Sequence, residues 1–269
     1  MFELTPSDFP CALPLLASIQ QAVLPYAICQ GINPGRVFVD QGEDPHVALC
    51  WTTVGYYLLA GDPEQGLNLA DLSQVLTGTF IPNSQAGGEN SFILMTSASG
   101  WQQHLPTLLP AREVIEIYRR PFAFERDKFA ARGDWHSRIP SGMRLQALDA
   151  TLAERAGVLA SWASLDDFLA HGLGFALLDG DQIASLCLSV LASREKVEID
   201  VHTHENYRRQ GLASITASAL IEACLQQGLL PNWECFWDNQ PSAALAERLA
   251  FTPLPDYPVY YWEEAGHGE

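Results

Sequence analysis

The sequence lacks a long apolar run: no uninterrupted stretch approaches the roughly 18 residues that a membrane-spanning helix needs. Its beginning also lacks the positive charge of an export signal. Glu3 and Asp8 stand there instead, and Pro6, Pro10 and Pro14 interrupt the apolar stretch. We therefore expect a cytoplasmic protein with no membrane partner.

Basic residues are scarce, with 15 Lys and Arg against 32 Asp and Glu and a net charge of -17. Such a surface repels nucleic acid and anionic membranes, which argues against both as partners, whereas it tolerates a cationic amine. Hydrophobic residues make up 48% of the chain, which is typical of a globular protein. Its 269 residues are enough for two domains, each with its own core.

The cysteines show no CxxC spacing. In a chain of this size and class, we expect reduced and mostly buried thiols rather than a disulfide framework or a structural metal site. The six cysteines are Cys11, Cys29, Cys50, Cys187, Cys224 and Cys235.

The few basic residues are unevenly distributed. Residues 1–110 hold only Arg36 against nine acidic residues, whereas residues 111–142 hold seven basic residues against five acidic ones. This basic segment with Pro and Gly suggests a junction between domains. We expect an α/β domain at 1–125, a linker at 126–142 and a second domain at 143–269.

The second domain shows the clearer periodicity. Asp179-Gly180 supplies a hairpin turn, and residues 196–204 alternate as in a strand. After residue 211, one narrow polar stripe along a mostly apolar stretch indicates a helix packed on a sheet. The expected elements are strands at 143–148, 174–178, 183–190, 196–204, 232–237 and 258–262, and helices at 150–157, 164–172, 212–228 and 241–251.

The first domain is less sharply patterned. Its apolar runs again predict a mixture of helices and strands. We expect helices at 13–23, 67–76 and 101–109, and strands at 36–40, 46–51, 55–60, 92–96 and 114–118.

The stretch "YRRQGLAS", Tyr207 to Ser214, combines features of a phosphate-binding loop. A strand ends just before it and a helix begins near Leu212, so the first turn of that helix offers unpaired N–H groups to an anion. Gly211 and Ala213 leave room for a close approach, and Arg208 and Arg209 add charged donors. A Walker loop is excluded, because neither of the two lysines follows a glycine-rich loop.

The spacing Arg208-x-x-Gly211-x-Ala213 resembles the pyrophosphate loop of the GNAT superfamily of N-acetyltransferases. Downstream, "NQPSAALAERLAF" is similar to that family's segment N-x-x-A-x-x-L-Y-x-x-x-G-F, with Asn239 at its asparagine. Together with "EIDVHTHENYRRQGLA" and "PNWE", these motifs look closest to the zwittermicin-resistance-type acetyltransferases.

This resemblance implies a mixed, mainly antiparallel sheet flanked by helices at 143–269. It implies acetyl-CoA as co-substrate, the amine of a small molecule as acceptor, and direct attack without a metal. The implied cofactor-binding residues are backbone groups of Val201 and Thr203, the loop residues Arg208, Arg209, Gln210, Gly211, Leu212, Ala213 and Ser214, and the side chain of Asn239.

Two positions depart from the family pattern. The Tyr that protonates the departing thiolate in many members is replaced by Ala246, and the usual Gly before Phe251 is Ala250. Loss of the Tyr leaves catalysis feasible, since a thiol with a pKa of about 8.5 can leave as thiolate. Tyr257, Tyr260 and Tyr261 are alternative acids.

Glu198, Asp200 and His202 alternate along one face of the strand before the loop, where the family often keeps its base. We favour Glu198 as the base that keeps the amine neutral, with His202 second; an ordinary strand face with ion pairs is the alternative. His202 and His204 have metal-ligand spacing but lack a third ligand at a suitable position, so we expect no metal. Trp233 and Trp237 share a face, as core residues or as a pocket wall.

Two functions are compatible with the sequence: an N-acetyltransferase, and a catalytically silent module that binds acyl-CoA or a partner, which Ala246 suggests. Residues 1–125 fit a degenerate copy of the same fold that covers the substrate side.

Overall fold

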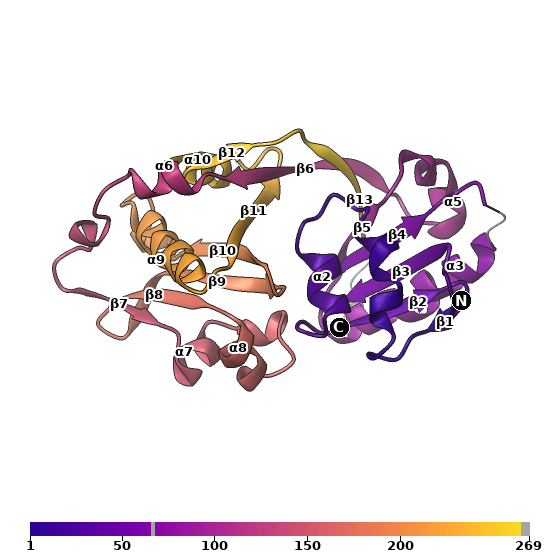
Figure 1. The fold of residues 1–269 in the computed structure, drawn as a ribbon, viewed down its shortest axis with the longest axis horizontal. Coiled ribbons are helices and arrows are strands. Elements are labelled where there is room, and N and C mark those ends of the chain that lie inside the picture. Colours follow the sequence, from indigo (N-terminus) through magenta and orange to yellow (C-terminus); the bar gives the residue numbers. More distant parts are fainter. Residues whose placement is uncertain (66–67, 265–269) are drawn as a thin grey trace. The chain divides into compact units, whose positions relative to one another are not determined.

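Strand β6 (Ile115–Phe124) divides the chain, because it begins in one compact unit and ends in another. Unit 1 holds Met1–Tyr118 together with the chain from Tyr257 onward, and unit 2 holds Arg119–Asp256. The structure is a computed structural model that describes residues 1–65 and 68–264 (Figure 1). The last strand, β13 (Tyr257–Glu263), therefore belongs with the N-terminal residues.

Unit 1 is a sheet with strand order β1-β2-β3-β4-β5-β13-β6. Neighbouring strands from β1 to β4 are antiparallel, β4 and β5 are parallel, and β13 runs antiparallel to β5. Its strands before β6 are β1 (Phe2–Glu3), β2 (Gly35–Val39), β3 (Val47–Thr52), β4 (Tyr56–Gly61) and β5 (Ser91–Thr96). Its helices are α1 (Leu13–Leu16), α2 (Leu24–Cys29), α3 (Leu69–Val75), α4 (Ile81–Ala86) and α5 (Leu105–Leu108), with a π-helical turn at Leu76–Phe80 between α3 and α4.

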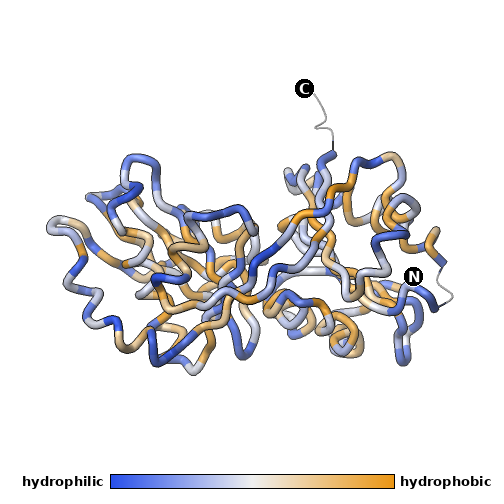
Figure 2. Tube along the Cα trace, turned by 90° about the horizontal axis from the view of Figure 1, so that it is seen from above, coloured by the Kyte–Doolittle hydropathy of each residue, from blue (hydrophilic) through white to orange (hydrophobic). Residues whose placement is uncertain are grey.

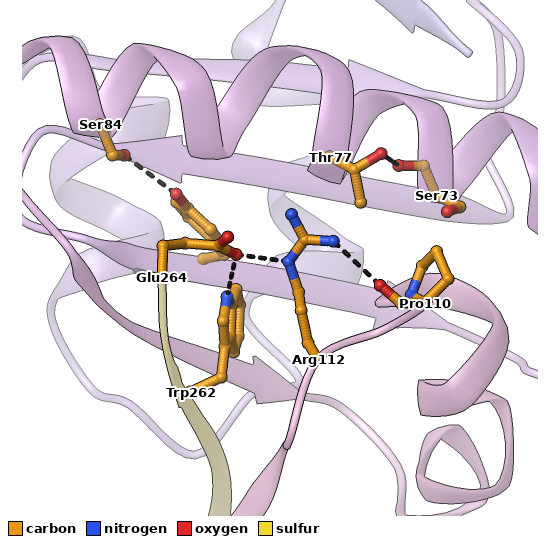
Figure 3. A network of polar contacts seen from close by, with 8 residues as sticks. Ser73, Thr77, Ser84, Pro110, Arg112, Trp262 and Glu264 are labelled. Carbon is orange, nitrogen blue, oxygen red and sulfur yellow. Dashed lines mark hydrogen bonds and ion pairs between the residues drawn. The ribbon is translucent and has the colours of Figure 1, made fainter. Parts of the chain in front are cut away.

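The core of unit 1 depends on side chains from β13. Trp262 is 1% exposed, and its ring lies 5.5 Å from that of Phe92 and 5.8 Å from that of Tyr57. The Trp262 indole N–H donates to Glu264 over 3.2 Å, and the same carboxylate is paired with the Arg112 guanidinium (Figure 3). These contacts fix the C-terminal strand in the N-terminal unit.

Unit 2 has strand order β6-β11-β10-β9-β8-β7, and β12 (Phe251–Pro253) pairs with the other edge of β6. Its pairs are antiparallel except β10 with β11, which are parallel. The strands are β7 (Met143–Ala147), β8 (Gly174–Asp179), β9 (Gln182–Ala192), β10 (Lys196–Thr203) and β11 (Leu230–Phe236). The helices are α6 (Arg126–Ala130), α7 (Ala150–Arg155), α8 (Leu165–His171), α9 (Leu212–Gln226) and α10 (Gln240–Arg248).

Helix α9 packs on one face of the β8–β10 strands, and α7 and α8 lie beyond the other face (Figure 1). Its middle is buried on all sides, including Ser218 at 1% exposure, so the predicted polar stripe is interrupted there. Figure 2 shows the distribution of hydropathy along the chain, with apolar segments inside each unit and polar residues in the outer turns. Within the described residues, no helix is both long and apolar enough to cross a membrane.

The predicted elements of unit 2 are present with small shifts of their ends. In unit 1, the helix expected at 13–23 is shorter: α1 ends at Leu16, and the next helix, α2, begins at Leu24 with Pro25 in its first turn. The first residue of the helix expected at 67–76, Leu67, lies outside the described residues; α3 begins at Leu69. Five cysteines are buried thiols, and Cys11 is exposed.

The domain boundaries differ from those expected at 125 and 142. The expected linker contains α6 and a 3-10 turn at His136–Arg138, and both belong to unit 2. The strand expected at 258–262 pairs with β5 of unit 1 rather than with residues 143–256. Both differences arise because strand pairing between distant segments leaves no mark on local composition.

Candidate active site

Strands β10 and β11 separate along their length. They pair at Lys196 with Leu230, at Val197 with Pro231 and at Glu198 with Asn232, yet β10 continues to Thr203 and β11 to Phe236. On its other edge, β10 pairs with β9 as far as Thr203. In the described chain, the edge of Ile199–Thr203 that faces β11 therefore has no strand partner and can hydrogen-bond an extended ligand with amide groups.

A β-bulge marks the point of separation. The β9–β10 register shifts between Glu198 and Ile199, which pair with Leu191 and Ser189, so β9 has one more residue than β10 at this point. Bulges increase the local twist of a strand pair, and this one coincides with the last β10–β11 pair. The opening is thus built into the sheet.

The segment after β10 leads to an open helix N-terminus. Gly211 is the N-cap of α9 with φ at 81°, and Arg209 has φ at 63°. A glycine cap has no side chain to accept a hydrogen bond. In the part of the chain that the structure describes, the N–H groups from Arg209 to Ala213 have no acceptor. Together with the helix dipole, they are suited to bind an anion.

The loop arginines are exposed and positively charged in a chain of net charge -17. Arg208 donates from Nε to the backbone oxygen of Thr203 over 3.2 Å, which ties the loop back to the end of β10. Gln210 donates to the backbone oxygen of Asn206 over 3.4 Å. The remaining guanidinium nitrogens of Arg208 and Arg209 can bind an anion at the helix start.

The remaining residues proposed for the cofactor lie on α9, β10 and α10. Thr203 Oγ1 lies 3.0 Å from Ser185 Oγ, which in turn lies 3.2 Å from Thr216 Oγ1 of α9, so the Thr203 side chain faces the helix. Leu212 is buried, whereas Val201, Ala213 and Ser214 are half-buried. Asn239 is the N-cap of α10 and accepts from the Ser242 N–H over 3.1 Å, which leaves its amide N–H groups directed elsewhere.

Glu198 is 6% exposed, and its Oε2 accepts from Asn232 Nδ2 over 2.6 Å. Asp200 and His202 are exposed on the same face of β10, which lies opposite Leu188 and Leu186 of β9 and away from α9. The structure therefore brings the three predicted residues onto one face and buries the one favoured as base. A buried carboxylate that accepts such a short hydrogen bond keeps a fixed orientation.

An ion pair on the neighbouring strands was not predicted from the sequence. Arg119 Nε of β6 lies 2.7 Å from Glu234 Oε1 of β11, and the two side chains are 9% and 1% exposed. The Arg119 guanidinium also lies 4.6 Å from the centre of the Phe236 ring. Glu234 alternates with Asn232 along β11, so this pair shares the face of Glu198. The available signal was an acidic residue inside the apolar strand at 230–236.

The position at which many family members have the tyrosine acid is buried in this chain. Ala246 is 0% exposed in α10, so its Cβ points into the core. All three alternative acids, Tyr257, Tyr260 and Tyr261, lie in β13 of unit 1. Burial raises the pKa of Tyr260, and Tyr261 donates to Glu263. Trp233 is a core residue at 2% exposure, whereas Trp237 is 49% exposed at the end of β11.

His204 has a structural contact at the start of the turn. Its Nδ1 accepts from the Asn206 N–H over 3.4 Å, and its ring lies 5.9 Å from that of Tyr207. Among the residues that the structure describes, no group of three or more His, Cys, Asp or Glu side chains could hold a metal ion.

Known proteins resemble the chain over nearly its whole length. The sequence model of the GNAT acetyltransferase family matches residues 13–260. The uncharacterized N-acetyltransferase YdfB of Bacillus subtilis is 29% identical over 242 residues, which are 88% of each chain.

Two solved structures show the fold. A GCN5-related N-acetyltransferase-like protein from Streptococcus suis superposes with a TM-score of 0.74 at 23% identity, over 96% of this chain and 99% of that one. A tandem GNAT protein from the clavulanic acid biosynthesis pathway superposes with a TM-score of 0.58 at 13% identity, over 99% and 98% of the two chains.

Proposed function

This chain belongs to the GNAT acetyltransferase family, and we propose that it transfers an acetyl group from acetyl-CoA to the amine of a small molecule. The observation that carries the proposal is the open N-terminus of α9, with the free N–H groups from Arg209 to Ala213 beside two arginines. A pyrophosphate is the anion that such a start of a helix binds well.

The proposed cofactor site extends from the loop into the open strand pair. The pyrophosphate would be held by the N–H groups at Gly211 and the guanidinium groups of Arg208 and Arg209. The pantetheine amides would pair with the free backbone edge of Val201–Thr203, and the Asn239 amide would contribute from the start of α10. This places the reactive end of acetyl-CoA toward the point where β10 and β11 separate.

We propose Glu198 as the group that accepts the amine proton, directly or through a water, with His202 as the second candidate. The neutral amine nitrogen attacks the acetyl carbonyl carbon, a C–N bond forms, the C–S bond breaks, and the thiolate of CoA leaves. The amine proton passes to Glu198, whose Oε2 accepts a hydrogen bond from Asn232. With Ala246 at the usual tyrosine position, departure as a thiolate is adequate near neutral pH, because the free thiol has a pKa of about 8.5.

The finer classification also remains a proposal. The stretches "EIDVHTHENYRRQGLA" and "PNWE" support a zwittermicin-resistance-type enzyme with a small-molecule amine as acceptor. The net charge of -17 is compatible with a cationic acceptor and unfavourable for polyanions.

We further propose that unit 1 is a copy of the fold that does not bind acyl-CoA. Its parallel strands β4 and β5 pair from Tyr56 with Ile93 to Leu59 with Thr96, the last residue of β5. Ser97 then continues the contact, because its N–H donates to the Leu59 oxygen over 3.1 Å. The strands of unit 1 therefore leave no opening at the place where β10 and β11 separate in unit 2.

The helix after β4 is also unlike α9. Asn68 caps α3 by accepting from the N–H groups of Ala70 and Asp71 over 3.2 and 3.4 Å. Asp71 adds a negative charge to the first turn. Both features oppose a bound phosphate, so we expect one acyl-CoA per chain.

Titration calorimetry with acetyl-CoA tests the site. We expect a stoichiometry of one and a large loss of affinity in Gly211→Ala. Gly228→Ala is the matched control: Gly228 follows the other end of α9 with φ at 75°, against 81° for Gly211, and an added Cβ meets no atom within 4 Å at either position. Both variants thus carry the same backbone strain. Equal affinity in the two variants would show that the loop does not hold the pyrophosphate.

The alternative is a silent acyl-CoA-binding module, which the closed position of Ala246 favours. Thiol release from acetyl-CoA in the presence of a panel of small amines at mildly alkaline pH separates the two. Turnover with any amine supports the enzyme. Tight binding of acetyl-CoA without turnover across the panel supports the silent module.

A further inference from the structure

Three arginines of unit 2 carry charge that the described chain does not neutralise. Arg132 follows α6, Arg138 ends the 3-10 turn at His136–Arg138, and Arg248 ends α10. In the described residues, none of their side chains makes an ion pair or accepts or donates a hydrogen bond.

Packing brings the segments of Arg132 and Arg248 together. The Phe124 ring lies 5.0 Å from the Phe251 ring and 5.7 Å from the Phe129 ring of α6. The Glu125 N–H donates over 2.9 Å to the oxygen of Ala250, two residues after Arg248. Arg132 then lies with its guanidinium carbon 5.9 Å from the centre of the Phe129 ring.

The Arg132 guanidinium is in an unfavourable position without a ligand. Its Nη1 is buried and has no hydrogen-bond partner among the residues that the structure describes. Burial lowers the pKa of Arg132, and so do the neighbouring charges of Arg138 and Arg248. The carboxylates of Asp134 and Glu222 pair with His136, at 3.1 and 3.9 Å. An anion among the three arginines would satisfy the buried donor and offset the repulsion.

The position of this arginine cluster suggests which anion. Ile139, next to Arg138, packs with Trp135 against an apolar group that includes Leu212 and Ile215 of the first turn of α9. The cluster therefore begins beside the first turn of α9, where we place the pyrophosphate of acyl-CoA. The same molecule carries one more phosphate, a monoester on its ribose.

We infer that Arg132, Arg138 and Arg248 bind a phosphate monoester, and that this is the 3′-phosphate of the acyl-CoA held at Gly211. The inference rests on the proposed function for its ligand but on separate residues for its evidence. It makes this side of unit 2 a second anchor for the cofactor, one that distinguishes CoA from its dephosphorylated form. Inorganic phosphate shares the same chemistry and is the competing ligand.

The test is titration calorimetry with acetyl-CoA and with 3′-dephospho-acetyl-CoA. We expect the unaltered protein to bind acetyl-CoA about tenfold more tightly, the effect of one partly exposed charge-assisted contact. In Arg138→Gln and in Arg132→Gln/Arg248→Gln, this preference should fall to near one. Arg138 is exposed, so its substitution is compatible with folding even if the substitution of the partly buried Arg132 is not.

Arg126→Gln is the charge-matched control. Arg126 is exposed in α6, the helix that Arg132 follows, and it is not among the charges that lower the pKa of Arg132. This variant should keep the tenfold preference. If the unaltered protein binds both ligands equally, the inference is wrong while the proposed function stands. If it binds neither, the proposed function itself fails.

A competition experiment with inorganic phosphate distinguishes the two possible ligands of the arginine cluster. Competition of phosphate with acetyl-CoA but not with the dephosphorylated ligand supports the inference. Phosphate binding that Arg138→Gln abolishes, without any preference between the two CoA forms, would assign the cluster to free phosphate and overturn the assignment to acyl-CoA.

Discussion

Asn232 donates to Glu198 over 2.6 Å at the last pair of residues before β10 and β11 separate. The two side chains thus mark the inner end of the opening between the strands. A buried carboxylate at this point is oriented by its amide partner and lies on the face of the sheet opposite α9. The proposed base therefore lies at the inner end of the strand opening in which we place the cofactor.

Glu198→Gln should lower kcat for amine acetylation by about 10²–10⁴-fold, the usual contribution of a general base. The affinity for acetyl-CoA should remain, because the proposed phosphate contacts lie at Arg208–Ala213. Asp200→Asn is the control: it removes a carboxylate two residues further on the same face. Steady-state kinetics with calorimetry separates the two effects. An unchanged kcat in Glu198→Gln would show that Glu198 is not the base and would leave His202 as the candidate.

Arg119→Met should destabilise unit 2 by about 3–5 kcal/mol, because it leaves the buried Glu234 carboxylate without its ion-pair partner. Arg119→Met/Glu234→Leu should recover much of this loss, since apolar side chains replace both charges. Hydrogen exchange of the β11 amides measures the local stability. If the double variant is as unstable as the sum of the two single variants, the pair is not coupled as the geometry indicates.

Trp262→Ala should destabilise unit 1 by about 3–5 kcal/mol, the usual effect of removing a large core side chain. The matched control is Trp237→Ala, which removes an indole that is 49% exposed. Hydrogen exchange of β4 and β5 amides should show lost protection only in Trp262→Ala. Equal protection in both variants would mean that the last strand contributes little to the N-terminal core.

Acid should weaken the contact between β6 and the segment after β12. The hydrogen bonds from Arg120 to Asp256, at 2.7 Å, lower the pKa of that carboxyl. A carboxyl whose pKa is lower in the folded chain stabilises the fold above its unfolded pKa of about 4, and this stabilisation is lost as pH falls through the folded value. Asp256→Asn should therefore melt at a lower temperature than the unaltered protein at pH 7, with the difference vanishing at more acidic pH. A difference that persists in acid would argue against this pair as its source.

Local signals in the sequence predicted unit 2 well. The Asp179-Gly180 turn and the helices expected at 164–172 and 212–228 depend on short-range features, and each lies close to where it was expected. The loop around Gly211 could be predicted for the same reason, since its chemistry is contained in a few consecutive residues.

Features that depend on distant residues could not be predicted. Arg119 and Glu234 are separated by 115 residues, and nothing near either one indicates the other. The pairing of β13 with β5 likewise joins the two ends of the chain. The burial of Glu198 depends on the strands on both sides of β10. The alternating pattern of β10 therefore predicted the face on which Glu198 lies, but not that this face is buried there.

The two sheets cannot be completed in the order in which their residues are made. Unit 1 begins with the first residues but needs Tyr257–Glu263 to fill its sheet and core, whereas every residue of unit 2 has been made by Asp256. On the ribosome, unit 2 can therefore close first, while the N-terminal strands wait with an open edge beside β5. The part of the chain that is synthesised first is thus the part that completes its fold last.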